Sequence, residues 1–261
     1  MIIKTPLRLS LVGGGSDLSY FYEKNEGSSL GFPINFFNYI YISKLEQKLI
    51  HFVSDKENIE TNNVRTIKND ILRNVLTKFK VNQKKIFIFS DLAYGTGLGS
   101  SSAMTVGLIR AINKFEDLGL KNNQLANEAY KVEKKATGST IGKQDHYMST
   151  FGGINLFKYK TDNTTKVEKI KISDRKIANL EKHILLIRVG GVRNASEILH
   201  DQKNNLIYNE TKFQNMKRLT GFVSLVKNAI LNSDYKEVGK LISETWEIKK
   251  SFSKHISNPE I

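Results

Sequence analysis

The 261-residue chain contains no cysteine. Disulfides and thiolate metal sites are therefore excluded, and a chain without thiols fits a reducing compartment. The sequence also lacks an apolar run long enough to cross a bilayer, and its N-terminus lacks the long apolar segment and small-residue cleavage site of a signal peptide. We therefore expect a cytoplasmic protein that has no membrane partner.

The sequence has no low-complexity tract and no internal repeat. Hydrophobic residues make up 39% of the chain, which is ordinary for a globular protein. The 40 Lys and Arg residues exceed the 26 Asp and Glu residues, and the resulting net charge of +14 attracts anions such as nucleotides, phosphorylated metabolites and nucleic acids. The basic residues are scattered rather than gathered in one arm, which argues against a nucleic-acid track.

The hydrophobic pattern predicts strands in three stretches of the first hundred residues. Residues 2–13 are typical of a strand pair or a bent strand, with Pro6 at an edge or a bulge. Residues 38–43 alternate at period two, and the apolar run in residues 84–91 predicts a strand buried on both faces. Strands and helices occur without a regular strand–helix alternation, which favours an α+β fold.

Further elements follow from periodicity, and they suggest one domain at 1–175 and a second at 176–261. Residues 152–173 resemble a hairpin that closes the first domain, and residues 183–191 predict a buried strand followed by a helix from Ala195. Four amphipathic helices are expected with these apolar stripes: Met104, Leu108, Ala111, Ile112 and Phe115; Leu125, Ala129, Val132 and Ala136; Phe213, Met216, Leu219, Val223, Val226 and Ile230; and Val238, Leu241, Ile242 and Thr245.

A glycine-rich stretch, "AYGTGLGSSSAM" at residues 93–104, lies between a predicted strand and a helix that begins near Ser101. The first N–H groups of a helix have no intrahelical partner, and glycine allows close approach of the backbone to a phosphate. A Walker A loop would need a lysine, and a dinucleotide fingerprint would need a different glycine spacing. The stretch therefore predicts phosphate binding, and a tight turn capped by serines is the alternative.

Two more clusters contain polar residues beside glycines. Asp17 follows three glycines, where it could cap a turn or accept hydrogen bonds from polyol hydroxyls. Between Gly142 and Gly152, a short helix presents Lys143, Gln144, Asp145 and His146. Separately, Glu133 lies at the border of an apolar stripe, where a carboxylate is costly unless a cation or a donor accompanies it.

These stretches together resemble the GHMP small-molecule kinases, a family that includes galactokinase and mevalonate kinase. The resemblance is carried by "PLRLSLVGGGSDL" at 6–18, "GTGLGSSSA" at 95–103 and "GKQDHYMSTFGG" at 142–153. Within the family, the sequence is most similar to the D-glycero-D-manno-heptose 7-phosphate kinases, with fucokinases and galactokinases as near neighbours. The resemblance implies a first domain like the second domain of ribosomal protein S5, a ferredoxin-like second domain, and phosphorylation of an anomeric hydroxyl by ATP.

The resemblance also implies a role for each matching residue. Asp145 would be the catalytic base, Arg8 would be the cation beside the reacting hydroxyl, and Ser101 and Glu133 would hold Mg²⁺. The phosphates of ATP would bind to Gly95, Gly97, Leu98, Gly99, Ser100, Ser101 and Ser102. The sugar would bind to Asp17, with Gly14, Gly15, Ser16 and Gln144 beside it. From the residues themselves, the substrate's own phosphate is expected at Arg193, which follows Gly190 and Gly191 and precedes a helix capped by Asn194. Lys143 is a second candidate for that phosphate, and a surface position at a helix start is the alternative for Arg193.

The family's third glycine-rich motif has no equivalent in this sequence, which stops at "SKHISNPEI". We therefore expect an incomplete second domain that leaves the apolar faces around Val238 and Leu241 partly uncovered. Such a chain would be a weak or inactive kinase and would associate, for example as a homodimer, through the uncovered faces.

Two other functions remain open at this stage. An RNA-binding module of the same fold would line one sheet face with basic residues and interleaved aromatics, although the aromatics of 38–43 and 86–89 are expected in the core. A catalytically inactive sensor of sugars or nucleotides would differ from the kinase only in its activity.

Overall fold

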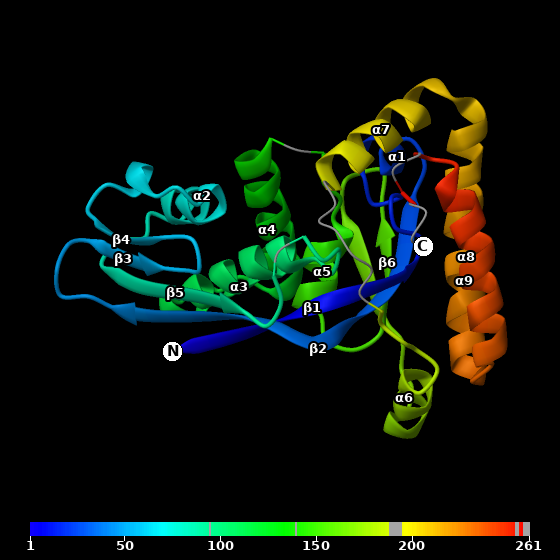
Figure 1. The fold of residues 1–261 in the computed structure, drawn as a ribbon, viewed down its shortest axis with the longest axis horizontal. Coiled ribbons are helices and arrows are strands. Elements are labelled where there is room, and N and C mark those ends of the chain that lie inside the picture. The colour runs from blue at the N-terminus through cyan, green and yellow to red at the C-terminus, as the bar shows by residue number, and fades with distance from the viewer. Residues whose placement is uncertain (94, 139, 188–194, 254–255, 258–261) are drawn as a thin grey trace. The chain divides into compact units, whose positions relative to one another are not determined.

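The computed structural model describes residues 1–93, 95–138, 140–187, 195–253 and 256–257 (Figure 1). The chain forms two compact units that interleave along the sequence. Unit 1 comprises Met1–Arg8, Pro33–Ser139 and Asp145–Phe151, and unit 2 comprises Leu9–Phe32, Thr140–Gln144 and Gly152–Ile261. The mixed α+β class is confirmed. The division at residue 175, and the S5-like and ferredoxin-like assignments, stay predictions.

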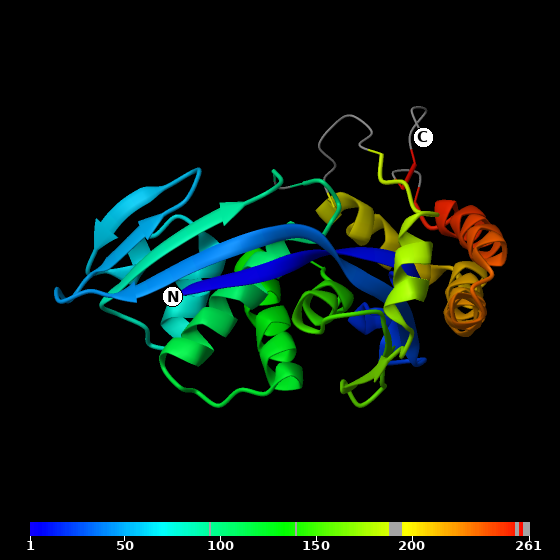
Figure 2. The ribbon, with the colours of Figure 1, turned by 90° about the horizontal axis from the view of Figure 1, so that it is seen from below.

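Unit 1 is a sheet with helices on one face. Its strands follow the order β4 (Asn58–Thr61), β3 (Ile50–Val53), β5 (Lys84–Ser90) and β2 (Gly27–Lys44), and β1 (Ile2–Val12) pairs with β2. The β2–β5 and β3–β4 pairs are antiparallel, whereas β3 and β5 are parallel. The helical elements are η1 (Val64–Thr66), α2 (Asp70–Lys78), α3 (Ser100–Phe115), α4 (Asn122–Thr137) and α5 (Gln144–Thr150). Figure 2 shows α2, α3 and α4 on the same face of the strands.

The core of unit 1 forms where this sheet face meets the helices. Ile40 and Ile42 of β2 and Ile86 and Ile88 of β5 point inward. The predicted stripes of α3 and α4 pack against them, and burial of this apolar surface is the main force that holds the layers together. The sequence-based prediction of both helices is confirmed.

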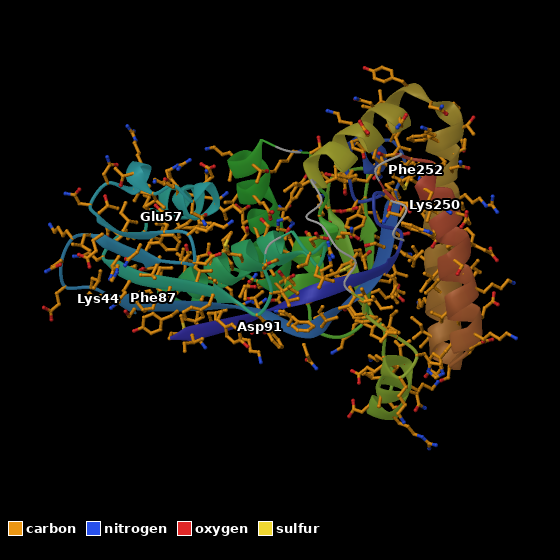
Figure 3. The ribbon with its side chains drawn as sticks, viewed as in Figure 1. Lys44, Glu57, Phe87, Asp91, Lys250 and Phe252 are labelled. Carbon is orange, nitrogen blue, oxygen red and sulfur yellow. The ribbon has the colours of Figure 1, made fainter. Side chains whose placement is uncertain are left out.

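The prediction that residues 84–91 are buried on both faces is wrong. Phe89 is 52% exposed, and Phe87 is only partly buried (Figure 3). In the β2–β5 register these rings lie opposite Tyr39 and Tyr41, so the aromatics of both strands share the face that α2–α4 do not cover. The apolar run misled the prediction because helices of unit 1 cover one sheet face, and the other stays open to solvent, as antiparallel sheets allow.

Unit 2 combines a hairpin with helices. The strand order is β2, β6 (Asn155–Tyr159) and β7 (Thr165–Lys169), all antiparallel, which confirms the predicted hairpin. The helices are α1 (Ser19–Tyr22), α6 (Asp174–Glu181), α7 (Ala195–Tyr208), α8 (Glu210–Asn232) and α9 (Tyr235–Lys250). None of the helices in the described ranges, the 23-residue α8 included, is long and apolar enough to span a membrane.

The strand predicted over 183–191 is not found in the described part of that segment. Residues 183–187 form no strand, and the Leu185 side chain is 83% exposed. A strand needs a neighbour that takes up its N–H and C=O groups, and none of the described strands pairs with these residues. Residues 188–191 lie outside the described residues. The helix predicted from Ala195 is confirmed as α7.

The expectation that the faces around Val238 and Leu241 are uncovered is also wrong. Both side chains are buried in a core that includes Val226 of α8 and Leu156 of β6. Helices α8 and α9 run side by side (Figure 1), and Ser233 makes the reversal between them at a φ of 61°. The two apolar stripes therefore cover each other. The prediction of a homodimer loses the argument from uncovered faces and stays a prediction.

We predict that Leu241→Ala lowers the free energy of unfolding by about 2–5 kcal/mol, because it leaves a cavity beneath α9. The matched control is Leu185→Ala, the same change at an exposed position, which should stay within about 0.5 kcal/mol of wild type. Urea unfolding followed by circular dichroism measures both. Equal effects of the two substitutions would mean that the α9 stripe is not part of the core.

Candidate active site

The glycine-rich loop between β5 and α3 has the backbone that the sequence predicted. Gly95, Gly97 and Gly99 have φ values of 87°, 77° and 72°, which side-chain-bearing residues rarely adopt. Gly99 is the N-cap of α3 and supplies no capping side chain. The Ser100 hydroxyl is buried and has no hydrogen-bond partner among the residues that the structure describes. The loop therefore leads into a helix start of the kind that can bind an anion, and phosphate binding there stays a prediction.

Arg8 of β1 joins the loop to Asp145 of α5. Its guanidinium donates from Nε to Asp145 Oδ1 at 2.7 Å and from Nη2 to Oδ2 at 2.6 Å. Nη1 donates to the Gly97 carbonyl at 2.7 Å, and the Arg8 backbone N–H donates to the Leu98 carbonyl at 3.1 Å. A Cβ on Gly99 would lie 3.1 Å from the Arg8 side chain, so the close approach requires glycine there. Both predicted catalytic residues thus lie at the glycine-rich loop.

Glu133 of α4 is a buried carboxylate with a donor on each oxygen. Oε1 accepts from the Ser101 hydroxyl at 2.7 Å, and Oε2 contacts His146 Nε2 at 2.6 Å. Burial raises the pKa of Glu133. The charge of His146 and hydrogen bonds from His146, Ser101 and Ser102 lower the pKa by more than burial raises it, so it lies below its ordinary value. The donors that the sequence required for this carboxylate are therefore present.

Ser101 and Glu133 fit a magnesium ion in their chemistry. A hydroxyl and a carboxylate are hard oxygen ligands, and Mg²⁺ takes one or two such protein ligands together with phosphate oxygens and water. Within the ranges that the structure describes, no group of three or more His, Asp or Glu side chains could hold a metal. Any magnesium at this site would therefore depend on the phosphates for its remaining ligands.

The predicted sugar-binding residues gather in unit 2 around Asp17. Its Oδ1 accepts from the Gly15 N–H at 2.9 Å, and its Oδ2 accepts from the Gln144 N–H at 3.0 Å. The Ser10 hydroxyl donates to Gln144 Oε1, which lies against Gly14. The buried carboxylate thus holds its own turn and the start of α5, and its binding to sugar hydroxyls stays a prediction.

Lys143 and Ser16 also make contacts within unit 2. Lys143 is fully buried, and its Nζ donates to the backbone carbonyl and the Oδ1 of Asn163, both at 2.6 Å, while it lies 4.4 Å from the Tyr22 ring centre. The Ser16 hydroxyl contacts the carbonyl of Ser28 at 2.8 Å. Contacts of these residues with a sugar phosphate stay predictions. Gly190, Gly191, Arg193 and Asn194 lie outside the described residues.

Two polar side chains at these clusters had no role in the sequence-based prediction. His146 was expected on the short helix, and the signal for its role was the carboxylate at Glu133, which needed a donor. Gln202 of α7 is buried, and within the described part of the chain its Nε2 has no hydrogen-bond partner. A Cβ on Gly15 would lie 2.3 Å from that atom. Nothing in the sequence around Gln202 indicates this contact, which only the packing of α7 creates.

Comparisons with known proteins find similarity to GHMP kinases. The family model for the GHMP kinases N terminal domain matches residues 65–153. The D-glycero-alpha-D-manno-heptose 7-phosphate kinase of Campylobacter jejuni is 27% identical over 270 residues, which cover 99% of this chain and 79% of that protein. The galactokinase of Thermotoga petrophila is 26% identical over 159 residues, which cover 58% of this chain and 44% of that protein.

Solved structures show the same fold. A D-glycero-D-manno-heptose 1-phosphate kinase from Bacteriodes thetaiotaomicron matches with a TM-score of 0.79 at 24% identity, over 96% of this chain and 79% of that one. The mevalonate kinase of Methanococcus jannaschii matches with a TM-score of 0.71 at 22% identity, over 100% of this chain and 81% of that one. At these identities the likeness concerns the fold alone.

We predict that Glu133→Gln destabilises the protein by about 1–3 kcal/mol at neutral pH, because it breaks a buried hydrogen-bonded pair. A folded-state pKa below the ordinary value means that the Glu133 carboxylate stabilises the fold above that value and stops doing so as the pH falls through the folded pKa. The difference between wild type and variant should therefore shrink below the ordinary glutamate pKa of about 4.3.

Urea unfolding at neutral and acidic pH measures this difference. The matched control is Glu60→Gln, which changes the same type of residue in a His–Glu pair at the surface, with His51 at 3.4 Å. An exposed pair contributes only about 0–1 kcal/mol, so this control should show little effect at either pH. A constant difference for Glu133→Gln across the pH range would contradict the assigned pKa direction.

Proposed function

The chain belongs to the GHMP kinase family, and from this we propose that it is an ATP-dependent sugar kinase acting on the anomeric hydroxyl of a sugar phosphate. The substrate that we propose is D-glycero-D-manno-heptose 7-phosphate, which would become the 1,7-bisphosphate. The bidentate pair of Arg8 and Asp145 against the phosphate loop carries the proposal. The choice of sugar follows the name of the Campylobacter relative, and a fucokinase-like or galactokinase-like sugar 1-kinase is the alternative.

The loop would bind the ATP phosphates through its backbone. The first N–H groups of α3 are unpaired by any cap and point along a helix dipole that favours anions. Phosphoryl transfer depends mainly on positioning and on neutralising the charge of the transferred group. Mg²⁺ held by Ser101 and Glu133 would supply part of that neutralisation. The net charge of +14 favours the approach of both anionic substrates.

Asp145 would accept the proton of the attacking hydroxyl while that oxygen bonds to the γ-phosphorus, and the bond from the γ-phosphorus to the bridging oxygen would break as ADP leaves. Arg8 holds both carboxylate oxygens of Asp145, so it fixes the orientation of the base and places a cation beside the reacting oxygen. An anomeric hydroxyl is more acidic than an ordinary alcohol, so a carboxylate is a sufficient base. We place this reaction in the cytoplasm, a prediction that depends on the absence of cysteine.

We predict that Asp145→Asn lowers kcat by about 10²- to 10⁴-fold, because it removes the general base while it keeps the side-chain shape. An assay of ATP consumption with a panel of sugars and sugar phosphates measures the effect and identifies the substrate. Nucleotide binding, followed by calorimetry, should persist in the variant because the loop itself is unchanged. If the preferred substrate is a sugar without a phosphate group, the result favours the fucokinase-like or galactokinase-like alternative.

The matched control is Asp117→Asn, at an exposed residue with a φ of 50°, a conformation that asparagine tolerates. This variant should keep the wild-type kcat. Arg8→Lys keeps the positive charge but cannot form the two parallel hydrogen bonds to the carboxylate, so we expect a loss of kcat there too. An Asp145→Asn variant as active as Asp117→Asn would overturn the assignment of the base. The absence of ATP consumption with any sugar in a chain extended at its C-terminus with the family's third glycine-rich motif would overturn the kinase.

The open sheet face of unit 1 supports a second candidate, the binding of single-stranded nucleic acid. Lys4 Nζ lies 3.6 Å from the centre of the Phe37 ring, and Lys85 Nζ lies 5.0 Å from that of Phe87. Aromatic rings interleaved with cations are typical of surfaces that stack bases. The same face also contains an acidic residue, Asp91, which accepts the Phe37 N–H at 2.8 Å (Figure 3). This acid opposes phosphate binding, and the kinase is the function that the observations favour.

If this second candidate is correct, Phe87→Ala should weaken the binding of a fluorescent oligouridine by about 1–3 kcal/mol in an anisotropy titration. Affinity should also fall as the salt concentration rises. Tyr208→Ala is the matched control, since Tyr208 is an aromatic residue of α7 that is 84% exposed. Absence of binding by the wild type at low salt would remove this candidate and leave the kinase unaffected.

A further inference from the structure

His146 is a buried, hydrogen-bonded histidine in unit 1 for which the proposed reaction has no direct use. Its side chain is fully buried, and Nε2 lies 2.6 Å from Oε2 of Glu133. A carboxylate can only accept, so Nε2 carries the hydrogen in this contact. The other ring nitrogen, Nδ1, has no hydrogen-bond partner in the ranges that the structure describes, and the ring forms an edge-to-face contact with Tyr130 at a centroid distance of 5.8 Å.

The position of His146 on α5 relates it to the candidate base. Asp145 and His146 are consecutive, and consecutive side chains on a helix point about 100° apart. The first turn of α5 therefore directs Asp145 to Arg8 and directs His146 to Glu133. The short helix is thus held by hydrogen bonds on two sides.

These contacts form a closed circuit around the candidate active site. Arg8 donates hydrogen bonds to the Gly97 carbonyl in the loop and to Asp145. His146 follows Asp145 in the chain and is hydrogen-bonded to Glu133. Glu133 in turn accepts from Ser101, which lies in the first turn of α3, directly after the loop. A change at any point of the circuit therefore alters the geometry between the phosphate loop and the base.

A purely stabilising role for the His146–Glu133 pair is the simpler alternative. A buried polar pair contributes little net stability, however, because its desolvation offsets its attraction, and apolar residues of similar volume often do as well. What the pair supplies instead is a fixed orientation for the Glu133 carboxylate and for the beginning of α5. Groups that orient a metal-binding carboxylate from behind typically change affinity or activity by about 10- to 100-fold when they are removed.

From this geometry we infer that His146 is a positioning residue, which sets the base Asp145 and the carboxylate of Glu133 in their mutual orientation. The inference depends on the proposed kinase function for its catalytic consequence. Its structural part, the fixing of α5 by the imidazole N–H, can be measured in the protein without substrate.

The experiment compares three substitutions of His146 in the full chain. His146→Gln can place an amide N–H near the position of Nε2 and should keep most of the wild-type kcat. His146→Phe keeps the ring without the donor, and His146→Asn has a donor that is too short to reach. Both should lower kcat by about 10- to 100-fold and leave the KM for the sugar unchanged. Amide hydrogen exchange of α5 should be faster in these two variants than in wild type and in His146→Gln.

His51→Phe is the matched control, because it removes an imidazole from the surface pair with Glu60. It should change neither kcat nor the exchange of α5. The inference would be overturned if His146→Phe or His146→Asn kept the wild-type kcat and the wild-type protection of α5. It would also be overturned if His146→Gln lost as much kcat as those two variants, because only the ring would then matter. If the wild-type chain, extended with the third glycine-rich motif, phosphorylates no sugar, the proposed kinase function fails, and the α5 exchange still decides whether the imidazole N–H fixes the helix.

Discussion

The buried carboxylate of Glu133 is the interaction on which the rest of unit 1 depends. A carboxylate away from water is costly unless donors satisfy it, and here Ser101 and His146 each donate to one of its oxygens. Ser101 lies in the first turn of α3 after the glycine loop, and His146 follows the candidate base Asp145 on α5. Satisfying a single buried charge therefore brings together two segments whose donors lie 32 and 13 residues from Glu133, on opposite sides of it in the chain.

The absence of a lysine from the glycine loop has a physical explanation in the same arrangement. The loop offers backbone N–H groups at an uncapped helix start, and its three glycines take positive φ values that other residues rarely adopt. The cation comes from Arg8 on β1, whose guanidinium contacts both the Gly97 carbonyl and Asp145. A fork-shaped cation can orient a carboxylate and contact the loop at once, which a lysine in the loop could not do.

The sequence predicted helices and hairpins better than it predicted exposure. The stripes of α3, α4, α8 and α9 follow a period of 3.6 residues, and this local signal survives in the fold. The burial predicted for the apolar runs at 84–91 and 183–187 was wrong, because the pattern of a run does not show which neighbouring element covers it. For the same reason the covered face at Leu241 was missed, because its partner stripe on α8 had to be positioned by the reversal at Ser233.

For the candidate site, the sequence by itself determined the chemistry: the glycines that permit the loop, the carboxylates at Glu133 and Asp145, and the cation Arg8. Local composition and spacing indicate the loop and the need of Glu133 for a donor, because helix starts and glycine turns are set by neighbouring residues. The roles of Asp145 and Arg8 followed from the resemblance to the GHMP kinases. The tertiary structure alone decided which groups meet. Arg8 and Asp145 are 137 residues apart, and no local pattern shows that His146 reaches Glu133. Such contacts arise only when distant elements pack around one core and every buried polar group must find a partner.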